Sequence, residues 1–151
     1  MNNKEKFSGL MNDDKHYLLV RVYFEDTDAG GIVYHTNYLK FAERARTEML
    51  RNFGIEHGTA LKVHGICFVV KECNMQFFKP GLLDDLLEVE TETLLIRGGS
   101  ISLCQKIRKE SDILFDMNIK LACINANGRA TRIPIKLRDR MSDLKKLKGE
   151  V

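Results

Sequence analysis

The sequence lacks several features that define whole classes of protein. No stretch approaches the roughly 20 apolar residues that a membrane-spanning helix needs, so we expect no integral membrane segment. Residues 1–15 lack the apolar middle region of a signal peptide, which predicts a cytoplasmic protein with a flexible leader at this end. The four cysteines are widely spaced and form no C-x-x-C pair. They favour neither a zinc site nor a disulfide framework, and we predict buried thiols and no metal ligands.

Motifs for nucleotides and nucleic acids are also missing. Gly30 and Gly31 have neither the spacing nor the helix context of a P-loop or a dinucleotide-binding turn. A net charge of +3 suits many partners, so it selects none. The basic segment near the C-terminus contains no interleaved aromatic residues, and we therefore expect no nucleic-acid partner.

The composition is that of one globular domain. The chain has 151 residues, of which 44% are hydrophobic and 30% charged, enough to bury a core without metals or disulfides. We predict the folded domain over residues 16–134, after the leader. Residues 135–151 are expected to be a basic, weakly helical tail.

The periodicity predicts one long helix among strands. Residues 17–25 are β-branched and aromatic, which is typical of a buried strand. From residue 37 the apolar side chains recur at helical spacing up to Phe53, and Gly54 supplies a stop signal. Two small residues in the middle of this apolar face, Ala42 and Ala45, allow the helix to pack closely on its neighbour.

Beyond the helix the chain is predicted to form strands. The expected strands cover residues 65–78, 86–96, 100–108 and 113–124. A Gly-Gly turn at residues 98–99 favours antiparallel pairing of the two strands around it. The class is therefore α+β. A single helix covers one face of such a sheet and leaves its edges open, which makes a homodimer plausible.

The stretch from Asp26 to Tyr38 gathers the acids, the glycines and the candidate catalytic side chains between the first strand and the helix. Backbone N–H groups in a first helical turn have no intrahelical acceptor, so such a junction can bind an oxyanion or a polarised carbonyl. Asp28 adds a carboxylate beside it. We expect Asp26 to order the turn through hydrogen bonds.

Residues 26–50, D-T-D-A-G-G-I-V-Y-H-T-N-Y-L-K-F-A-E-R-A-R-T-E-M-L, resemble the signature of the hotdog-fold thioesterases of the 4-hydroxybenzoyl-CoA thioesterase family. The resemblance is to the YbgC-type branch associated with the Tol-Pal system. It implies a hotdog fold, in which a five-stranded antiparallel sheet wraps around one long central helix. It also implies an acyl-CoA thioesterase without a cofactor, a homodimer or tetramer, and a thioester carried by coenzyme A or acyl carrier protein.

The resemblance assigns catalysis to Asp28 and His35. Asp28 is the nucleophile or the general base, and the sequence leaves both roles open. The N–H of His35 polarises the carbonyl, and its imidazole is a second candidate for proton transfer or substrate contact. Tyr34 is expected to line the pocket, and Tyr38 to belong to the core or an acyl tunnel. The predicted substrate-binding residues are Gly30, Gly31, Val33, Tyr34, Tyr38 and Glu43.

Two other functions remain open at this stage. One is a hotdog hydratase, although the order of residues in the motif argues against it. The other is a non-catalytic protein that binds acyl groups or acyl carrier protein in envelope maintenance or lipid synthesis.

Overall fold

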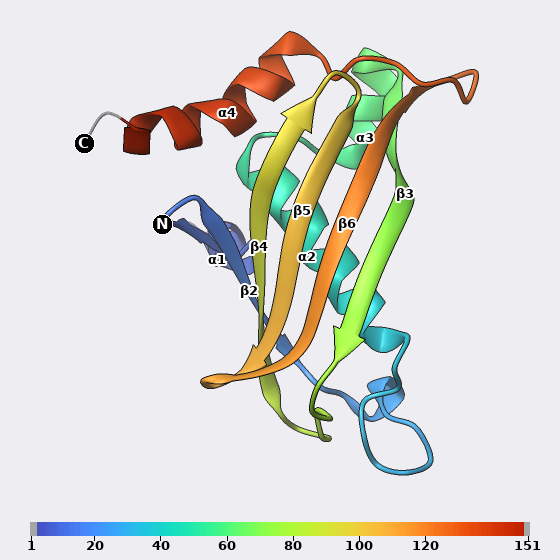
Figure 1. Cartoon of the computed structure of the whole chain (residues 1–151), viewed down its shortest axis with the longest axis vertical. Helices are drawn as coiled ribbons and strands as arrows, with labels where there is room; N and C mark the ends of the chain where they lie inside the picture. The colour runs from blue at the N-terminus through green and yellow to red at the C-terminus, as the bar shows by residue number, and fades with distance from the viewer. Residues whose placement is uncertain (1–2, 150–151) are drawn as a thin grey trace.

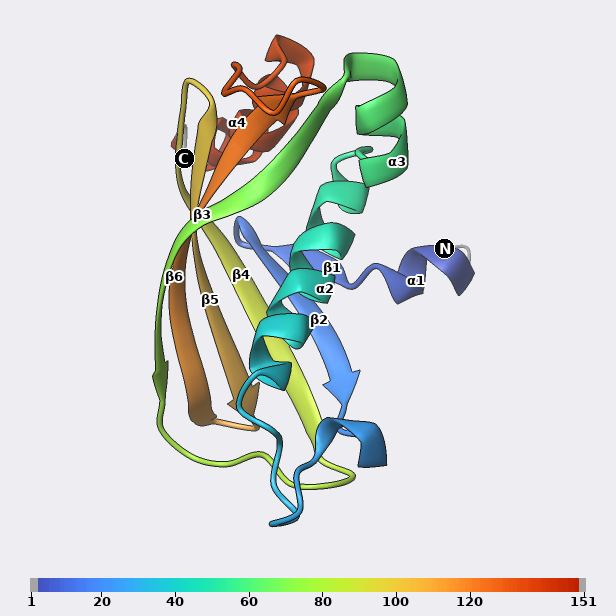
Figure 2. The ribbon, with the colours of Figure 1, turned by 90° about the vertical axis from the view of Figure 1, so that its right-hand side faces the viewer.

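The computed structural model describes residues 3–149, and it shows a curved antiparallel sheet with one long helix against its concave face (Figures 1 and 2). In chain order the elements are α1 (Asn3–Phe7), β1 (Leu10–Asn12), β2 (Lys15–Arg21), η1 (Phe24–Asp26), α2 (Asn37–Asn52), α3 (His57–Thr59), η2 (Ala60–His64), β3 (Ile66–Phe77), β4 (Leu86–Arg97), β5 (Ser100–Lys109), β6 (Asp112–Asn125) and α4 (Ile135–Gly149). The predicted α+β class is confirmed.

The sheet has six strands in the order β1-β2-β4-β5-β6-β3, and every neighbouring pair is antiparallel. The expectation of five strands was wrong by one, because β1 lies within the segment predicted to be a leader. Asp13 and Asp14, with φ of 53° and 63°, form the two-residue turn that folds β1 onto β2. Just before β1 the backbone at Gly9 lies against the backbone of β2. A Cβ at this position would lie 2.2 Å from the Tyr17 carbonyl oxygen, so only glycine fits.

The central helix α2 begins and ends where the sequence predicts. Phe41, Ala42 and Ala45 are completely buried, so the small residues do bring the helix close to the sheet. Gly54 follows the last turn with φ of 80°, and its N–H donates to the carbonyl of Arg51. A left-handed glycine in this place is a common helix terminator.

A buried polar side chain, Gln105 on β5, joins the sheet to α2. Its Nε2 donates to the carbonyl oxygen of Ala42 at 3.0 Å and to Oγ1 of Thr91 at 2.9 Å, and its Oε1 accepts from Arg46 at 2.9 Å. Gln105 is completely buried. Burial lowers the pKa of the Arg46 guanidinium.

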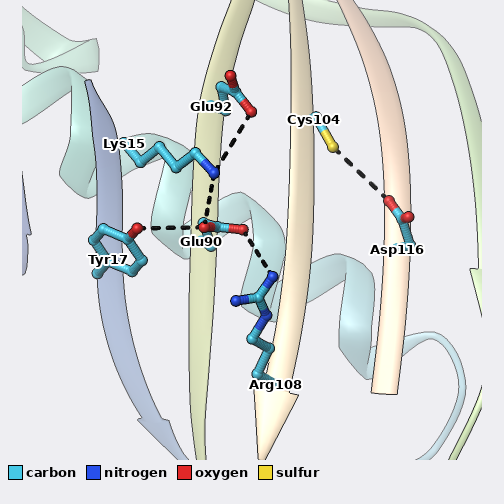
Figure 3. A network of polar contacts seen from close by, with 7 residues as sticks. All are labelled: Lys15, Tyr17, Glu90, Glu92, Cys104, Arg108 and Asp116. Carbon is cyan, nitrogen blue, oxygen red and sulfur yellow. Dashed lines mark hydrogen bonds and ion pairs between the residues drawn. The ribbon is translucent and has the colours of Figure 1, made fainter. Parts of the chain in front are cut away.

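The convex face of the sheet carries a cluster of charged side chains around Glu90 (Figure 3). Glu90 is 5% exposed, and its carboxylate lies 3.2 Å from Nζ of Lys15 and 3.5 Å from Arg108. The hydroxyl of Tyr17 donates to it at 3.3 Å. These contacts join the neighbouring strands β2, β4 and β5 on the face opposite to α2.

The strand β3 lies at the end of the sheet, where one of its two edges has no neighbouring strand among the described residues, and most of its side chains are exposed. Only Ile66 of its twelve residues is buried. This exposure corrects the prediction of buried thiols: Cys123 is buried on β6, whereas Cys73 is exposed on β3, and Cys67 and Cys104 are partly exposed. Among the described residues, no helix is long and apolar enough to cross a membrane.

Candidate active site

The loop between β2 and α2 is held at both ends by Asp26. One carboxylate oxygen of Asp26 accepts from the N–H of Tyr23 at 2.8 Å, and the other accepts from Nδ2 of Asn37 at 2.9 Å. Its carbonyl accepts from the N–H of Tyr34 at 2.9 Å. Asp26 is 3% exposed and Asn37, the first residue of α2, is 5% exposed. This buried contact fixes the loop against the start of the helix, in the ordering role expected for Asp26.

Asp28 lies at the tip of a tight turn within this loop. Its Oδ1 accepts from the N–H of Gly30 at 2.8 Å, and its backbone N–H donates to the carbonyl of Ile32 at 2.9 Å. Gly31 has φ of 79°, a conformation that glycine adopts without strain. The carboxylate is exposed, so a substrate can approach it from solvent.

A second loop, between β3 and β4, supports the first. The N–H of Val33 donates to the carbonyl of Gly81 at 2.9 Å, and the N–H of Gly81 donates to the Tyr38 hydroxyl at 2.9 Å. Val33 and Tyr38 are each 3% exposed. Burial raises the pKa of the Tyr38 phenol, which keeps it neutral. Both residues therefore belong to the core beneath the loop.

His35 stands immediately before the start of α2. Its side chain is exposed, and no backbone carbonyl of residues 3–149 accepts a hydrogen bond from its N–H. Thr36 occupies the N-cap position but makes no side-chain capping hydrogen bond. The N–H groups of Asn37 and Leu39 donate to the carbonyls of Tyr34 and Thr36, so it is the N–H of His35 that can stabilise negative charge on a ligand at the start of the helix.

Aromatic rings connect this helix start to the edge strand β3. The ring of His35 lies 4.8 Å from that of Tyr34 and 6.3 Å from that of Phe77. Phe77 also contacts Tyr38 and Phe115, whose rings stack 5.3 Å apart. Tyr34 and Phe77 are 45% and 48% exposed, so they offer an apolar surface beside His35.

The remaining predicted residue, Glu43, lies on the exposed face of α2; burial lowers the pKa of Arg46, and the charge of Glu43 opposes part of that lowering. A cavity of about 1140 Å³ lies elsewhere, along β2, and Asp28 and His35 do not line it. Among the described residues, no group of three or more His, Cys, Asp or Glu side chains is arranged to hold a metal ion.

Comparison with known proteins identifies the family. The sequence profile described as the thioesterase superfamily matches residues 30–115. This chain belongs to the thioesterase superfamily. The acyl-CoA thioester hydrolase YbgC of Escherichia coli O6:H1 is 43% identical over 107 residues, which cover 70% of this thioesterase and 79% of the relative. The acyl-CoA thioesterase YbgC of Haemophilus influenzae is 43% identical over 115 residues, covering 76% and 85%.

Solved structures agree with the sequence relatives. A probable thioesterase from Bartonella henselae superposes with a TM-score of 0.76 at 35% identity, covering 80% of this chain and 99% of that one. The hotdog fold and the YbgC-type branch predicted from the motif are confirmed, with a sixth strand added. The protein is a thioester hydrolase.

Two features of this thioesterase were missed by the sequence analysis. Asn37 was noted only as part of the motif, although its partnership with Asp26 is what positions the loop. Phe77 was assigned to a strand, and no local signal places it beside His35, which is 42 residues earlier in the chain.

Proposed function

We propose that this protein hydrolyses an acyl-CoA thioester to a free acid and coenzyme A, with Asp28 and the N–H of His35 as its catalytic groups. The proposal rests above all on one arrangement: an exposed carboxylate on a glycine turn, in a loop that a buried hydrogen bond fixes to the uncapped start of α2. The relatives named as acyl-CoA thioesterases support the choice of substrate.

The chemistry requires a nucleophile and a site for the developing oxyanion. In one route Asp28 removes a proton from water, the resulting hydroxide attacks the carbonyl carbon, and the C–S bond then breaks to release the thiol. In the other, the Asp28 carboxylate attacks the carbonyl carbon, the C–S bond breaks to release the thiolate, which takes up a proton, and water then hydrolyses the resulting mixed anhydride to the free acid and the Asp28 carboxylate. In both routes, the carbonyl oxygen accepts a hydrogen bond from the N–H of His35 as its negative charge grows.

The other predicted substrate-binding residues fall into exposed ones, which can touch the substrate, and buried ones, which support the loop. Gly30 and Gly31 leave room for the thioester near Asp28, and Tyr34 forms a wall of the pocket. Val33 and Tyr38 act from below by holding the loop. Glu43 remains a proposed contact to the acyl group, supported only by its place in the motif.

The same proposal includes a homodimer joined along β3. Phe77 ends this strand and contacts His35, so a second subunit pairing with β3 lies close to the site. A partner at this edge covers the exposed rings of Tyr34 and Phe77 beside His35.

Thiol release with Ellman's reagent tests the activity. Short-chain, long-chain and hydroxybenzoyl thioesters of coenzyme A are compared, followed by acyl carrier protein thioesters, with wild type beside Asp28→Asn and the exposed neighbour Glu25→Gln as control. We expect Asp28→Asn to lose about 100-fold or more in kcat while remaining folded. Equal activity of the folded Asp28→Asn protein and wild type overturns the assignment. No cleavage of any thioester by wild type overturns the function.

Single turnover in ¹⁸O-labelled water separates the two roles of Asp28. A mixed anhydride that water opens at the Asp28 carboxyl carbon places ¹⁸O in the side chain of Asp28, which mass spectrometry of the peptide detects; opening at the acyl carbon labels only the product, so a labelled peptide establishes the covalent route. General base catalysis leaves that peptide unlabelled and puts the isotope only in the product acid.

A pair of variants separates the two roles of His35. His35→Ala keeps the backbone N–H, whereas His35→Pro removes it. We expect the proline variant to lose about 100 to 1000-fold in kcat, the usual effect of one oxyanion donor, and the alanine variant to lose much less. An equal loss in both variants, with unchanged thermal stability, assigns the role to the imidazole instead.

A further inference from the structure

The strand β2 has a free edge over its second half. It pairs with β4 along its whole length, Lys15–Arg21, but β1 covers only its first three residues, Lys15–Tyr17. Residues 18–21 therefore have a hydrogen-bonded neighbour on one side only within the described chain. Figure 2 shows β2 at the edge of the sheet, with α1 and β1 on the side of its first half.

The alternation of the strand identifies the open backbone groups. Asn12 and Lys15 flank a two-residue turn, where the facing residues exchange hydrogen bonds, so the N–H and C=O of Lys15 point toward β1. Every second residue points the same way. The N–H and C=O of Leu19 and Arg21 are thus directed to the free side. The N–H of Val22 agrees with this alternation: it points away from the free side and donates to the backbone carbonyl of Asp85 at 2.9 Å.

A groove runs along this edge. Its volume is about 1140 Å³, and its walls come from the N-terminal segment, β2 and α2. The apolar side chains Phe7, Leu10, Leu19 and Tyr23 line it and are 81%, 58%, 61% and 60% exposed. At about 3.3 Å per residue, the free edge spans roughly four residues of an added strand, and the groove accommodates side chains on both of its faces.

The charges along the groove favour an acidic ligand. Lys6, Arg21 and Arg44 line it, and within the described part of the chain none of them pairs with a carboxylate, while Arg21 also donates to the backbone carbonyl of Asp84 at 2.8 Å. Glu48 on the same wall lies 3.7 Å from Arg51, which it shares with Glu56 at 2.9 Å. Glu88 is the other acid in the lining, which leaves an excess of positive charge.

A second copy of this chain does not suit the groove. The edge of β2 is recessed between the N-terminal segment and α2, which together wall the groove, so a single peptide strand fits more readily than the edge of another sheet. In addition, a chain that paired through β3 and also through β2 would form an open-ended ribbon instead of a closed oligomer.

We propose that the free edge of β2 binds an extended, acidic segment of a partner protein, which adds as a strand beside Leu18–Arg21. Main-chain hydrogen bonds to Leu19 and Arg21 supply affinity, as in other cases of strand addition. Apolar side chains of the segment pack on Leu10, Leu19 and Tyr23, and its acidic side chains pair with Arg21 and Arg44. This role is separate from the thioesterase site and does not depend on it.

The test uses a phage-displayed library of random dodecapeptides selected on the wild-type protein. Enriched peptides are synthesised, and their binding is measured by fluorescence polarisation against wild type, Leu19→Pro and Leu19→Thr. Proline removes the N–H that points to the free side, which an edge position tolerates, whereas threonine keeps it. We expect acidic peptides with alternating apolar residues, bound at least 10-fold more weakly by Leu19→Pro and within 3-fold of wild type by Leu19→Thr.

Two controls keep the result independent of folding. Both variants should retain wild-type thermal stability and thioesterase activity, since Leu19 lies outside the catalytic loop.

If Leu19→Pro fails to fold, the same peptides methylated on alternate backbone nitrogens are tested on wild type, and one of the two methylation registers should lose at least 10-fold in affinity. Equal binding of both methylated registers overturns the proposal, as do selected peptides that are basic or that bind folded Leu19→Pro as well as wild type. A smaller assembly of Leu19→Pro in sedimentation velocity identifies a second copy as the occupant and overturns it too.

Discussion

Asp26 and Asn37 are two buried residues, and the hydrogen bond between their side chains ties the loop between β2 and α2 to the start of the helix. Asp26→Asn leaves one oxygen for two donors, the N–H of Tyr23 and Nδ2 of Asn37. One donor is then unsatisfied in a buried place, which costs about 1 to 3 kcal/mol. We expect a lower melting temperature and a reduced kcat, measured by calorimetry and thiol release.

The reciprocal double variant is the control for this prediction. In Asp26→Asn combined with Asn37→Asp, the amide oxygen at position 26 accepts from Tyr23, and the amide nitrogen donates to the carboxylate at position 37. Stability and kcat should then recover in part. If the double variant is no better than Asp26→Asn, the hydrogen bond is not the reason that the loop holds its place.

His16 makes the stability of the fold sensitive to pH. It is completely buried; its Nε2 lies 2.6 Å from the carbonyl oxygen of Ser8, and its Nδ1 has no partner among the described residues. Burial lowers the pKa of the imidazole, against smaller opposing effects of the Ser8 carbonyl and the Glu48 charge. The folded protein therefore holds this side chain neutral.

The sign of the pH dependence follows from this lowered pKa. Above about pH 6.5 both folded and unfolded chains carry neutral His16, and the stability is unaffected by its titration. Below that pH the unfolded chain binds a proton that the folded one does not, so stability falls by up to about 1.4 kcal/mol per pH unit. Urea unfolding at pH 7.5, 6.5 and 5.5 should show this fall in wild type and in the exposed control His64→Gln. It should be weaker in His16→Gln, and an equal slope in all three proteins contradicts the prediction.

Among the elements, α2 and the sheet are joined by the buried amide of Gln105. Replacing Gln105 by Met, which has a similar length, removes three hydrogen bonds and leaves the Arg46 guanidinium and the Thr91 hydroxyl without a partner. We expect a loss of about 2 to 3 kcal/mol in the free energy of unfolding, measured from urea transitions. Arg46→Met added to Gln105→Met should cost less than the sum of the single changes, because no buried charge is then left unpaired. Additive losses contradict the coupling.

The elements also divide into those that local sequence predicts and those that it does not. The bounds of α2 follow from apolar spacing and from Gly54, and the β4–β5 hairpin follows from its two glycines, because such signals act within a few residues. By alternation Gln105 falls on the apolar face of its strand, with Leu103 and Ile107, but the sequence does not show what satisfies its amide, and Glu90 belongs to a row of glutamates on an outward face. Their burial depends on Arg46 and Lys15, which are 59 and 75 residues away in the chain. The role proposed for the loop between β2 and α2 comes from its family motif, whereas the contact between His35 and Phe77 required the fold.

At the scale of the whole molecule, the sheet ends in a long strand without a cover. On β3, Val69, Val70 and Phe77 are 37%, 53% and 48% exposed, and the strand pairs with β6 on one side only. Natural sheets usually protect such an edge with charges, prolines or a covering element. Lys71, Glu72 and a register shift interrupt β3, but the exposed apolar side chains on either side of them suit a subunit interface next to His35.

Val70→Lys tests this interface against a matched control. Leu95 on β4 is also 53% exposed, so Leu95→Lys adds the same charge at the same exposure but away from the edge. We expect wild type and Leu95→Lys to be dimers by sedimentation equilibrium, whereas Val70→Lys should shift toward the monomer. In the dimer the new lysine would lose its hydration and would be repelled by the same lysine of the second subunit. Since the pocket is then open to water on one side, kcat/KM of Val70→Lys should fall at least 10-fold at low protein concentration and recover in part as the concentration is raised. A monomeric wild type with full activity, or a dimeric Val70→Lys, contradicts a site shared across β3. The dependence of activity on concentration distinguishes loss of the interface from local damage to the loop, which would lower the rate at every concentration.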